Sequence, residues 1–178
     1  MKRSALRVGL VSDTHGLFDP LLSELLAGCD LILHAGDIVK PEILDELARI
    51  APLRAVRGNN DDCPAFQALP ELAVVELGAL TAVLVHQVGA PGRLFPSVRR
   101  ALSRHRAQLL VYGHSHRPAA ALDGGLLLVN PGSAGPGRFR LPRAAGLLLV
   151  HGRAAEVRLF DLASPGLPLL EPPLATSW

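Results

Sequence analysis

Residues able to bind metal ions gather directly after apolar segments of this chain. Asp13-Thr14-His15 follows the first such segment, Gly36-Asp37 the second, and Gly58-Asn59-Asn60-Asp61 the third. Two later apolar segments end in His86 and in Gly113-His114-Ser115-His116. In open α/β sheets, the loops beyond the carboxyl ends of the strands form the ligand crevice. We therefore expect these side chains to converge on one site.

The number of candidate ligands indicates two metal ions. Two carboxylates, one carboxamide and four imidazoles exceed what one ion of ordinary coordination number requires. If Asp37 bridges two ions, each receives four protein ligands and keeps room for water, as two-metal hydrolysis requires. Imidazole and carboxylate ligands predict two divalent transition-metal ions, with manganese the first choice and iron, zinc, nickel or cobalt as alternatives.

Apolar runs broken by glycine, proline or aspartate predict the strands that position these residues. The expected strands are Leu6–Ser12, Asp30–His34, Leu53–Arg57, Leu72–Leu77, Leu80–His86, Gln108–Tyr112, Pro118–Leu122, Leu126–Val129, Ala145–Val150 and Ala155–Phe160. Helical patterns cover Pro20–Ala27, Pro41–Ala51 and Ser97–Arg106. The βαβαβ opening implies parallel strands, whereas glycine turns in the later half predict antiparallel hairpins. Two mixed sheets with helices outside them satisfy both halves.

The ordered set D-x-H, G-D, G-N, H and G-H-x-H resembles the calcineurin-like metallophosphoesterases. The chain length and Asn130-Pro131-Gly132-Ser133 are similar to their small bacterial and archaeal phosphodiesterase branch. The resemblance implies an α/β fold, a four-layer αββα sandwich of two mixed β-sheets flanked by helices. We expect a metallophosphoesterase domain over residues 1–160 and a tail rich in proline and leucine over 161–178. That tail is either weakly ordered or docked on the body or on a neighbouring subunit.

The resemblance also implies how the ligands are shared. Asp13, His15, Asp37 and His116 would hold one ion, and Asp37, Asn59, His86 and His114 the other. A hydroxide bridging the ions would attack phosphorus in line. The implied activity is a phosphodiesterase, a phosphoric ester hydrolase, acting on a small phosphodiester or nucleotide-like substrate. The alternative is a non-catalytic scaffold of the same fold, as in the retromer complex, but all seven ligand positions are filled here.

Two positions depart from the family pattern. Many relatives have histidine where this chain has Asn60, which can donate a hydrogen bond to substrate or leaving group but cannot deliver a proton. Gln87 replaces the glycine that usually follows the histidine ligand. Either Gln87 crowds His86 and weakens the second ion, or it is harmless to the site.

Three other residues are candidates for supporting roles. Asp61 either orients the metal loop, contributing to catalysis, or caps the next turn. Arg143 resembles the family arginine that follows the Asn-Pro-Gly-Ser motif, which implies contact with substrate phosphate. His34, three residues before Asp37, is a candidate partner of the metal ligands.

Composition limits the partners. A formal charge of +2 gives no long-range attraction for polyanions, which disfavours long nucleic acid as substrate. The two cysteines, Cys29 and Cys63, predict a reducing cytoplasm and no disulfide framework. No apolar stretch reaches the roughly 18 residues of a membrane span. A homo-oligomer is left open.

Overall fold

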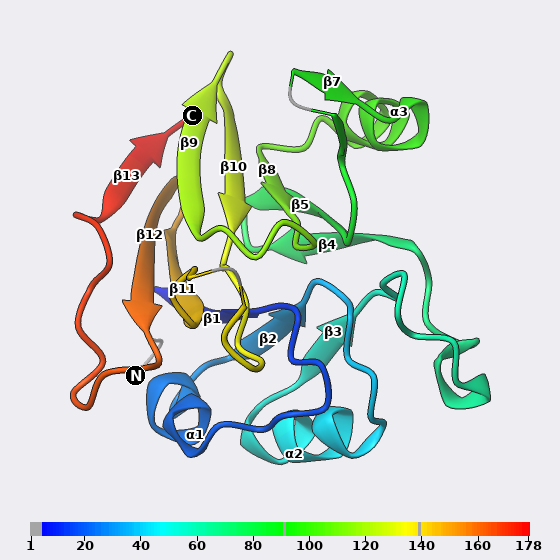
Figure 1. The fold of residues 1–178 in the computed structure, drawn as a ribbon. Coiled ribbons are helices and arrows are strands. Elements are labelled where there is room, and N and C mark those ends of the chain that lie inside the picture. Colours follow the sequence, from blue (N-terminus) through cyan, green and yellow to red (C-terminus); the bar gives the residue numbers. More distant parts are fainter. Residues whose placement is uncertain (1–4, 91, 139) are drawn as a thin grey trace.

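The computed structural model describes residues 5–90, 92–138 and 140–178, and two large β-sheets form its centre (Figure 1). The first sheet has six strands in the order β13-β12-β11-β1-β2-β3. Their bounds are β1 Leu6–Val11, β2 Leu31–His34, β3 Leu53–Ala55, β11 Ala144–His151, β12 Ala154–Asp161 and β13 Leu174–Ser177. The first three strands are parallel, and β11, β12 and β13 are added antiparallel beside β1.

The second sheet has five strands in the order β4-β5-β8-β10-β9. Their bounds are β4 Leu72–Leu77, β5 Leu80–Val85, β8 Leu109–Val111, β9 Ala119–Asp123 and β10 Leu126–Asn130. The central strands β5, β8 and β10 are parallel, and the edge strands β4 and β9 pair antiparallel. A small hairpin of β6 (Gly89–Ala90) and β7 (Arg93–Leu94) follows β5.

Helices cover the outer face of each sheet. Apolar residues of α1 (Pro20–Leu26) and α2 (Glu42–Ile50) pack on the six-stranded sheet, and those of α3 (Pro96–His105) pack on the other sheet. The largest apolar cluster fills the space between the sheets. In β2, Ile32 faces the helices and Leu33 faces the other sheet, which is the period of two expected for a strand buried on both sides. The predicted αββα sandwich is confirmed.

The C-terminal segment docks on the body of the molecule. Its last strand, β13, pairs with β12, and the Trp178 indole donates a hydrogen bond to the carbonyl oxygen of Gly125 in the β9–β10 turn. Of the two alternatives for the tail, the structure therefore has the docked one. Among the helices that the structure describes, none has the length and apolar character needed to cross a membrane.

Candidate metal centre

The seven expected ligands lie in loops at the carboxyl ends of strands from both sheets. Asp13 and His15 follow β1, Asp37 follows β2, and Asn59 lies in the loop that follows β3. The second sheet contributes His86 directly after β5, and His114 and His116 after β8. The parallel direction of β1, β2 and β3, and of β5 and β8, brings these ends to one edge of the sandwich.

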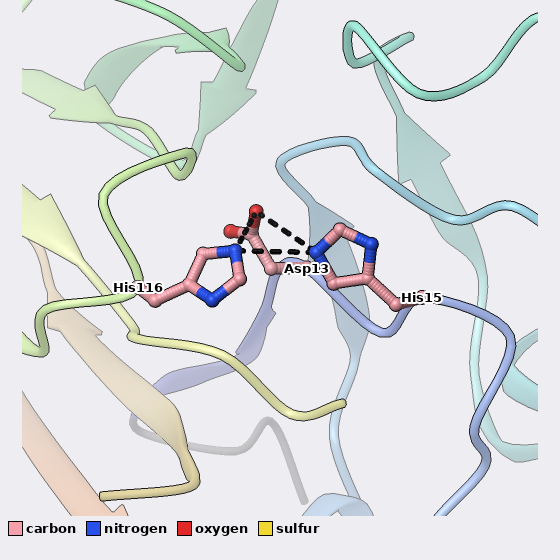
Figure 2. Close-up of side chains that lie close together, drawn as sticks. All are labelled: Asp13, His15 and His116. Atoms are coloured by element: carbon pink, nitrogen blue, oxygen red, sulfur yellow. Dashed lines mark hydrogen bonds and ion pairs between the residues drawn. The ribbon is translucent and has the colours of Figure 1, made fainter. Parts of the chain in front are cut away.

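Asp13, His15 and His116 form the first cluster, and Figure 2 shows their side chains turned toward one another. His116 Nε2 lies 3.1 Å from Asp13 Oδ1 and 3.2 Å from His15 Nε2. Two atoms bound to one ion at about 2.0–2.2 Å are separated by roughly 2.8–3.6 Å at tetrahedral or octahedral angles. These spacings therefore fit shared coordination of one ion.

The buried carboxylate of Asp13 has one oxygen left for an ion. Its Oδ2 atom accepts hydrogen bonds from Ser12 Oγ (2.6 Å) and the His114 amide (3.1 Å). Its Oδ1 atom is buried and accepts no hydrogen bond from the described part of the chain. An unsatisfied buried carboxylate oxygen is costly unless something else compensates its charge. A metal ion between Asp13 and the two imidazoles would do so.

Asp37 lies between the first cluster and a second cluster, which consists of Asn59, His86 and His114. Its Oδ2 atom is 3.9 Å from His15 Nε2, and its Oδ1 atom is 3.3 Å from His86 Nε2. His86 Nε2 is in turn 3.2 Å from the carboxamide oxygen of Asn59. The remaining expected ligand, His114, is exposed, and its ring lies 5.3 Å from that of His86. The carboxylate of Asp37 thus has one oxygen toward His15 and the other toward His86.

Hydrogen bonds fix which nitrogen of His86 can bind a metal. Its Nδ1 atom lies 2.7 Å from the carbonyl oxygen of Ala35, which can only accept, so Nδ1 carries the proton and Nε2 faces the ligand cluster. Burial disfavours the charged form of His86, but hydrogen bonding to Asp37 and nearby carboxylates outweigh it and raise its pKa. Burial likewise opposes the charged form of Asp37, yet hydrogen bonds from His86 and Asn60 hold its pKa well below the usual range.

The backbone at the ligands adopts a conformation that most residues avoid. Positive φ angles occur at five of the expected ligands: Asp13 (53°), His15 (45°), Asp37 (57°), His114 (67°) and His116 (56°). Such left-handed residues cost free energy and persist where the surrounding structure enforces them, often at functional sites. Because five fall in one ligand set, the loops are built to place these side chains.

Glycines allow the loops to approach one another. A Cβ atom on Gly58 would overlap the backbone and carboxylate of Asp37, and one on Gly113 would overlap Ser12 Oγ. At these two positions only a glycine leaves space for the neighbouring loops that carry Asp37 and Asp13. Neither glycine has a positive φ angle. Their presence beside Asn59 and His114 is therefore explained by close packing.

Asn130 and Ser133 brace the first cluster, a role that the sequence motif alone did not define. Asn130 Nδ2 donates to the carbonyl oxygen of Gly113 (2.9 Å) and to Ser115 Oγ (3.0 Å). Ser133 Oγ donates to the carbonyl oxygen of Asp13 (2.9 Å). The end of β10 and the loop that follows it thereby hold the two loops that carry the ligands of the first cluster.

Asp61 is a buried bracing residue. Its Oδ1 atom accepts hydrogen bonds from the backbone amides of Ile38 (2.7 Å) and Val39 (2.8 Å), and Oδ2 accepts from the amide of Gly58 (2.8 Å). These bonds join the loop that carries Asp37 to the loop that carries Asn59. Of the two roles expected from the sequence, the contacts favour orientation of the metal loop.

Arg143 is bound to the fold on the side of α1. Its guanidinium pairs with Asp19, which caps α1, and its Nε atom donates to the carbonyl oxygen of Gly135 (2.8 Å). These bonds use Nε and Nη2 and do not involve Nη1, so contact of Arg143 with substrate phosphate stays a prediction. Arg138 is exposed, and its charge is, after burial, the second cause that lowers the pKa of His15. Sequence reasoning did not single out Arg138, because it lies in no motif.

Gln87 contacts two ligands of the second cluster. Its Nε2 atom donates to Asn59 Oδ1 (2.8 Å) and lies 3.3 Å from His114 Nδ1. An ion held by these ligands must displace the Gln87 amide, so we predict that metal titration resolves two steps with a weaker second one. Gln87→Ala should tighten the second step about tenfold, the equivalent of one hydrogen bond. Calorimetry measures both steps.

The exposed Gln67 supplies the matched control for that titration, since Gln67→Ala should leave both steps unchanged. A single tight step that takes up two ions in the unaltered protein would contradict the prediction.

His34 is a buried, neutral link between the first two ligand loops. Its Nδ1 atom accepts from the Gly36 amide (3.1 Å), so the proton is on Nε2, 3.1 Å from Thr14 Oγ1. Burial lowers the pKa of His34 to about 4. The unfolded chain therefore takes up a proton below about pH 6.5 that the folded chain refuses, and stability falls as pH drops toward 4.

We predict that His34 accounts for roughly 2 to 3 kcal/mol of the stability lost by metal-free protein between pH 7 and pH 4.5. Urea unfolding at both pH values measures the loss, which should be smaller by that amount in His34→Gln. His151→Gln, at the exposed last residue of β11, is the control and should lose as much as the unaltered protein. Equal losses in all three proteins would show that His34 does not titrate as its burial requires.

Comparison with known proteins gives a consistent result. Residues 6–153 match the family model for the calcineurin-like phosphoesterase superfamily domain. A probable metallophosphoesterase of Methanothermobacter thermautotrophicus is 28% identical over 89% of this chain and 94% of its own length. A probable metallophosphoesterase of Methanocaldococcus jannaschii is 32% identical over 71% of this chain and 67% of its own length. The solved structure of Vacuolar Protein Sorting 29 from Cryptosporidium parvum, 24% identical, covers 99% of this chain and 100% of its own, with a TM-score of 0.82.

Proposed function

Because the chain belongs to the calcineurin-like phosphoesterase superfamily, we propose that it is a phosphodiesterase that uses two divalent transition-metal ions. The observation that carries this proposal is the position of Asp37, whose two carboxylate oxygens face His15 and His86 in separate clusters. One ion on each side of Asp37 would have imidazole and carboxylate ligands. Manganese is the first choice, and iron, zinc, nickel or cobalt suit the same ligands.

We assign the ligands in two sets that share Asp37. Asp13, His15 and His116 complete the first set, and Asn59, His86 and His114 complete the second. Bound there, the ions would stabilise negative charge on phosphoryl oxygens and lower the pKa of water. The protein needs no side-chain nucleophile for that chemistry. A net charge of +2 suits small phosphoesters better than long nucleic acid.

One imidazole of each cluster is prepared to bind metal. Burial and the charge of Arg138 lower the pKa of His15, so its imidazole is neutral near pH 7 and releases no proton when it binds. The bond to Ala35 presents His86 Nε2 in the correct tautomer. Such preorganisation keeps reacting groups aligned and avoids reorganisation during the reaction.

We propose that Asn60 acts mainly by holding Asp37. Its Nδ2 atom donates to Asp37 Oδ2 (2.6 Å), and its backbone amide donates to Oδ1 (2.9 Å). We predict that Asn60→Ala lowers the rates of all aryl phosphodiesters in proportion, about tenfold, as loss of a ligand's supporting partner does. The measurement is the slope of log rate against the pKa of the leaving phenol at saturating metal. A steeper slope in Asn60→Ala would instead support the leaving-group contact expected from the sequence.

The proposal is tested with metal-stripped protein re-supplied with each candidate ion in turn. We expect hydrolysis of bis(p-nitrophenyl) phosphate to return with metal and to exceed that of the monoester p-nitrophenyl phosphate. Faster hydrolysis of the monoester would contradict phosphodiesterase action. Full metal loading without hydrolysis of either ester would favour the alternative, a scaffold of this fold.

A further inference from the structure

A pocket of about 330 Å³ opens beside the second ligand cluster. Asn59 and His86 form the part of its lining that faces the metal centre. From there it extends between the start of β4, the end of β5 and the start of α3. A phosphoester held at the metal centre would therefore have one of its organic groups beside this pocket.

The walls away from the metal centre are apolar. Leu72 and Val85 are cross-strand partners of β4 and β5 and lie on the same face of the sheet. Phe95 completes this part of the lining, and its side chain remains 45% exposed. Among the described residues, four large hydrophobic side chains are exposed, and Phe95 is the one that is aromatic. An exposed aromatic ring in a pocket beside a metal centre is a ready contact surface for a ligand.

The backbone of Phe95 is firmly held. Its amide donates to the carbonyl oxygen of Val88 (2.8 Å), and its own carbonyl accepts from the Arg99 amide (3.0 Å) in the first turn of α3. The ring thus projects from a fixed point where the β6–β7 hairpin joins the helix. Because the backbone is fixed before a ligand arrives, stacking on the ring has only the two side-chain torsions of Phe95 to order.

Polar groups occupy the rim. Arg57 pairs with Glu71 through a contact of 2.7 Å, and the Glu71 side chain is 79% exposed. An ion pair this exposed is weakly held, so both groups can turn toward a ligand. A planar group in the pocket would meet an aromatic face at Phe95 and a hydrogen-bond donor and acceptor at its edge.

We propose that this pocket binds a planar aromatic group of the phosphoester substrate, stacked on Phe95 while the phosphate lies at the metal centre. The inference rests on the proposed function in one respect, since the metal centre positions the phosphate. The pocket volume is at the lower end of that of ligand sites, roughly 300–1,000 Å³, and accommodates one ring system. Aryl esters and nucleoside esters both carry a planar aromatic group that this pocket would bind.

Phosphonates that cannot be hydrolysed test the inference by binding alone. Calorimetry with manganese-loaded protein compares phenylphosphonate with cyclohexylphosphonate, which is similar in size but not planar, and with methylphosphonate. We expect phenylphosphonate to bind about tenfold more tightly than either, because stacking adds to area burial. Phe95→Ala should abolish the preference, Phe95→Leu should reduce it, and Leu122→Ala, at an exposed residue of β9, should preserve it.

Each other outcome is decisive. Equal binding of the phenyl and cyclohexyl compounds by the unaltered protein would overturn the inference, as would equal loss of all three ligands in Phe95→Ala. Hydrolysis of diesters without a preference for the phenyl compound would support the proposed function and contradict ring binding in the pocket. A preference for the phenyl compound without hydrolysis would support ring binding and contradict the proposed function. A thymidine phosphonate in the same titration separates the two sources, since a base edge gains affinity from Arg57 that Arg57→Met removes.

Discussion

Replacing Asp37 with alanine should abolish metal-dependent hydrolysis and most metal binding, with kcat at least about 10³-fold lower. The physical reason is that the two carboxylate oxygens of Asp37 face different clusters, at 3.9 Å from His15 Nε2 and 3.3 Å from His86 Nε2. Losing several kcal/mol of transition-state stabilisation from the ions corresponds to that factor. Metal content by emission spectroscopy and kcat with saturating manganese measure the two losses.

Asp62 gives the matched control for Asp37, because it is an exposed aspartate in the same region of the chain. Asp62→Ala should keep full activity and metal content. Circular dichroism must show that Asp37→Ala is folded, so that lost activity reflects the site. Full activity in folded Asp37→Ala would refute its place between the two ions.

Replacing Asp61 with alanine should lower the stability of metal-free protein by about 3 kcal/mol. Three buried or partly buried amides, of Ile38, Val39 and Gly58, would lose the carboxylate that accepts their hydrogen bonds. Each unsatisfied amide costs about 1 kcal/mol or more. For a chain of this size that corresponds to a fall in Tm of about 6–12 °C, measured by thermal unfolding.

Asp61→Ala should also weaken metal binding, because the loops of Asp37 and Asn59 lose their connection. Asp61→Asn should lie between the alanine variant and the unaltered protein, since one oxygen still accepts while the amide nitrogen opposes the Gly58 amide. Asp62→Ala should leave Tm within about 1 °C, as exposed substitutions usually do. An unchanged Tm in Asp61→Ala would show that the three hydrogen bonds contribute nothing to the fold.

The main strands, and the position of the expected ligands at the strand ends, were predictable because each depends on a short stretch of sequence. Asp13 and His15 directly follow an apolar run, and the same pattern marks Asp37 and His86. The helix predicted over Pro20–Ala27 is α1 (Pro20–Leu26), where Asp19 caps the first turn and accepts from the Leu21 amide. The ends of such elements could be predicted because they depend on residues within or next to the element itself.

The features that escaped prediction depend on long-range contacts. Strand β13 follows two prolines and is defined by pairing with β12, which sequence periodicity does not reveal. The hairpin strands β6 and β7 have two residues each, too few for a pattern. For Asp61 the sequence left two roles open, and only folding showed that the amides of Ile38 and Val39 lie against its carboxylate. Phe95 gave no signal because its role depends on which strand ends surround it.

We propose that Asp37 joins two metal ions in one centre, and anomalous diffraction from crystals grown with manganese tests this proposal most directly. We expect two anomalous peaks per chain, roughly 3.5–4 Å apart, each next to a carboxylate oxygen of Asp37. His15 and His116 should contact one peak, and His86 and Asn59 the other. A single peak, or two peaks without Asp37 between them, would contradict it.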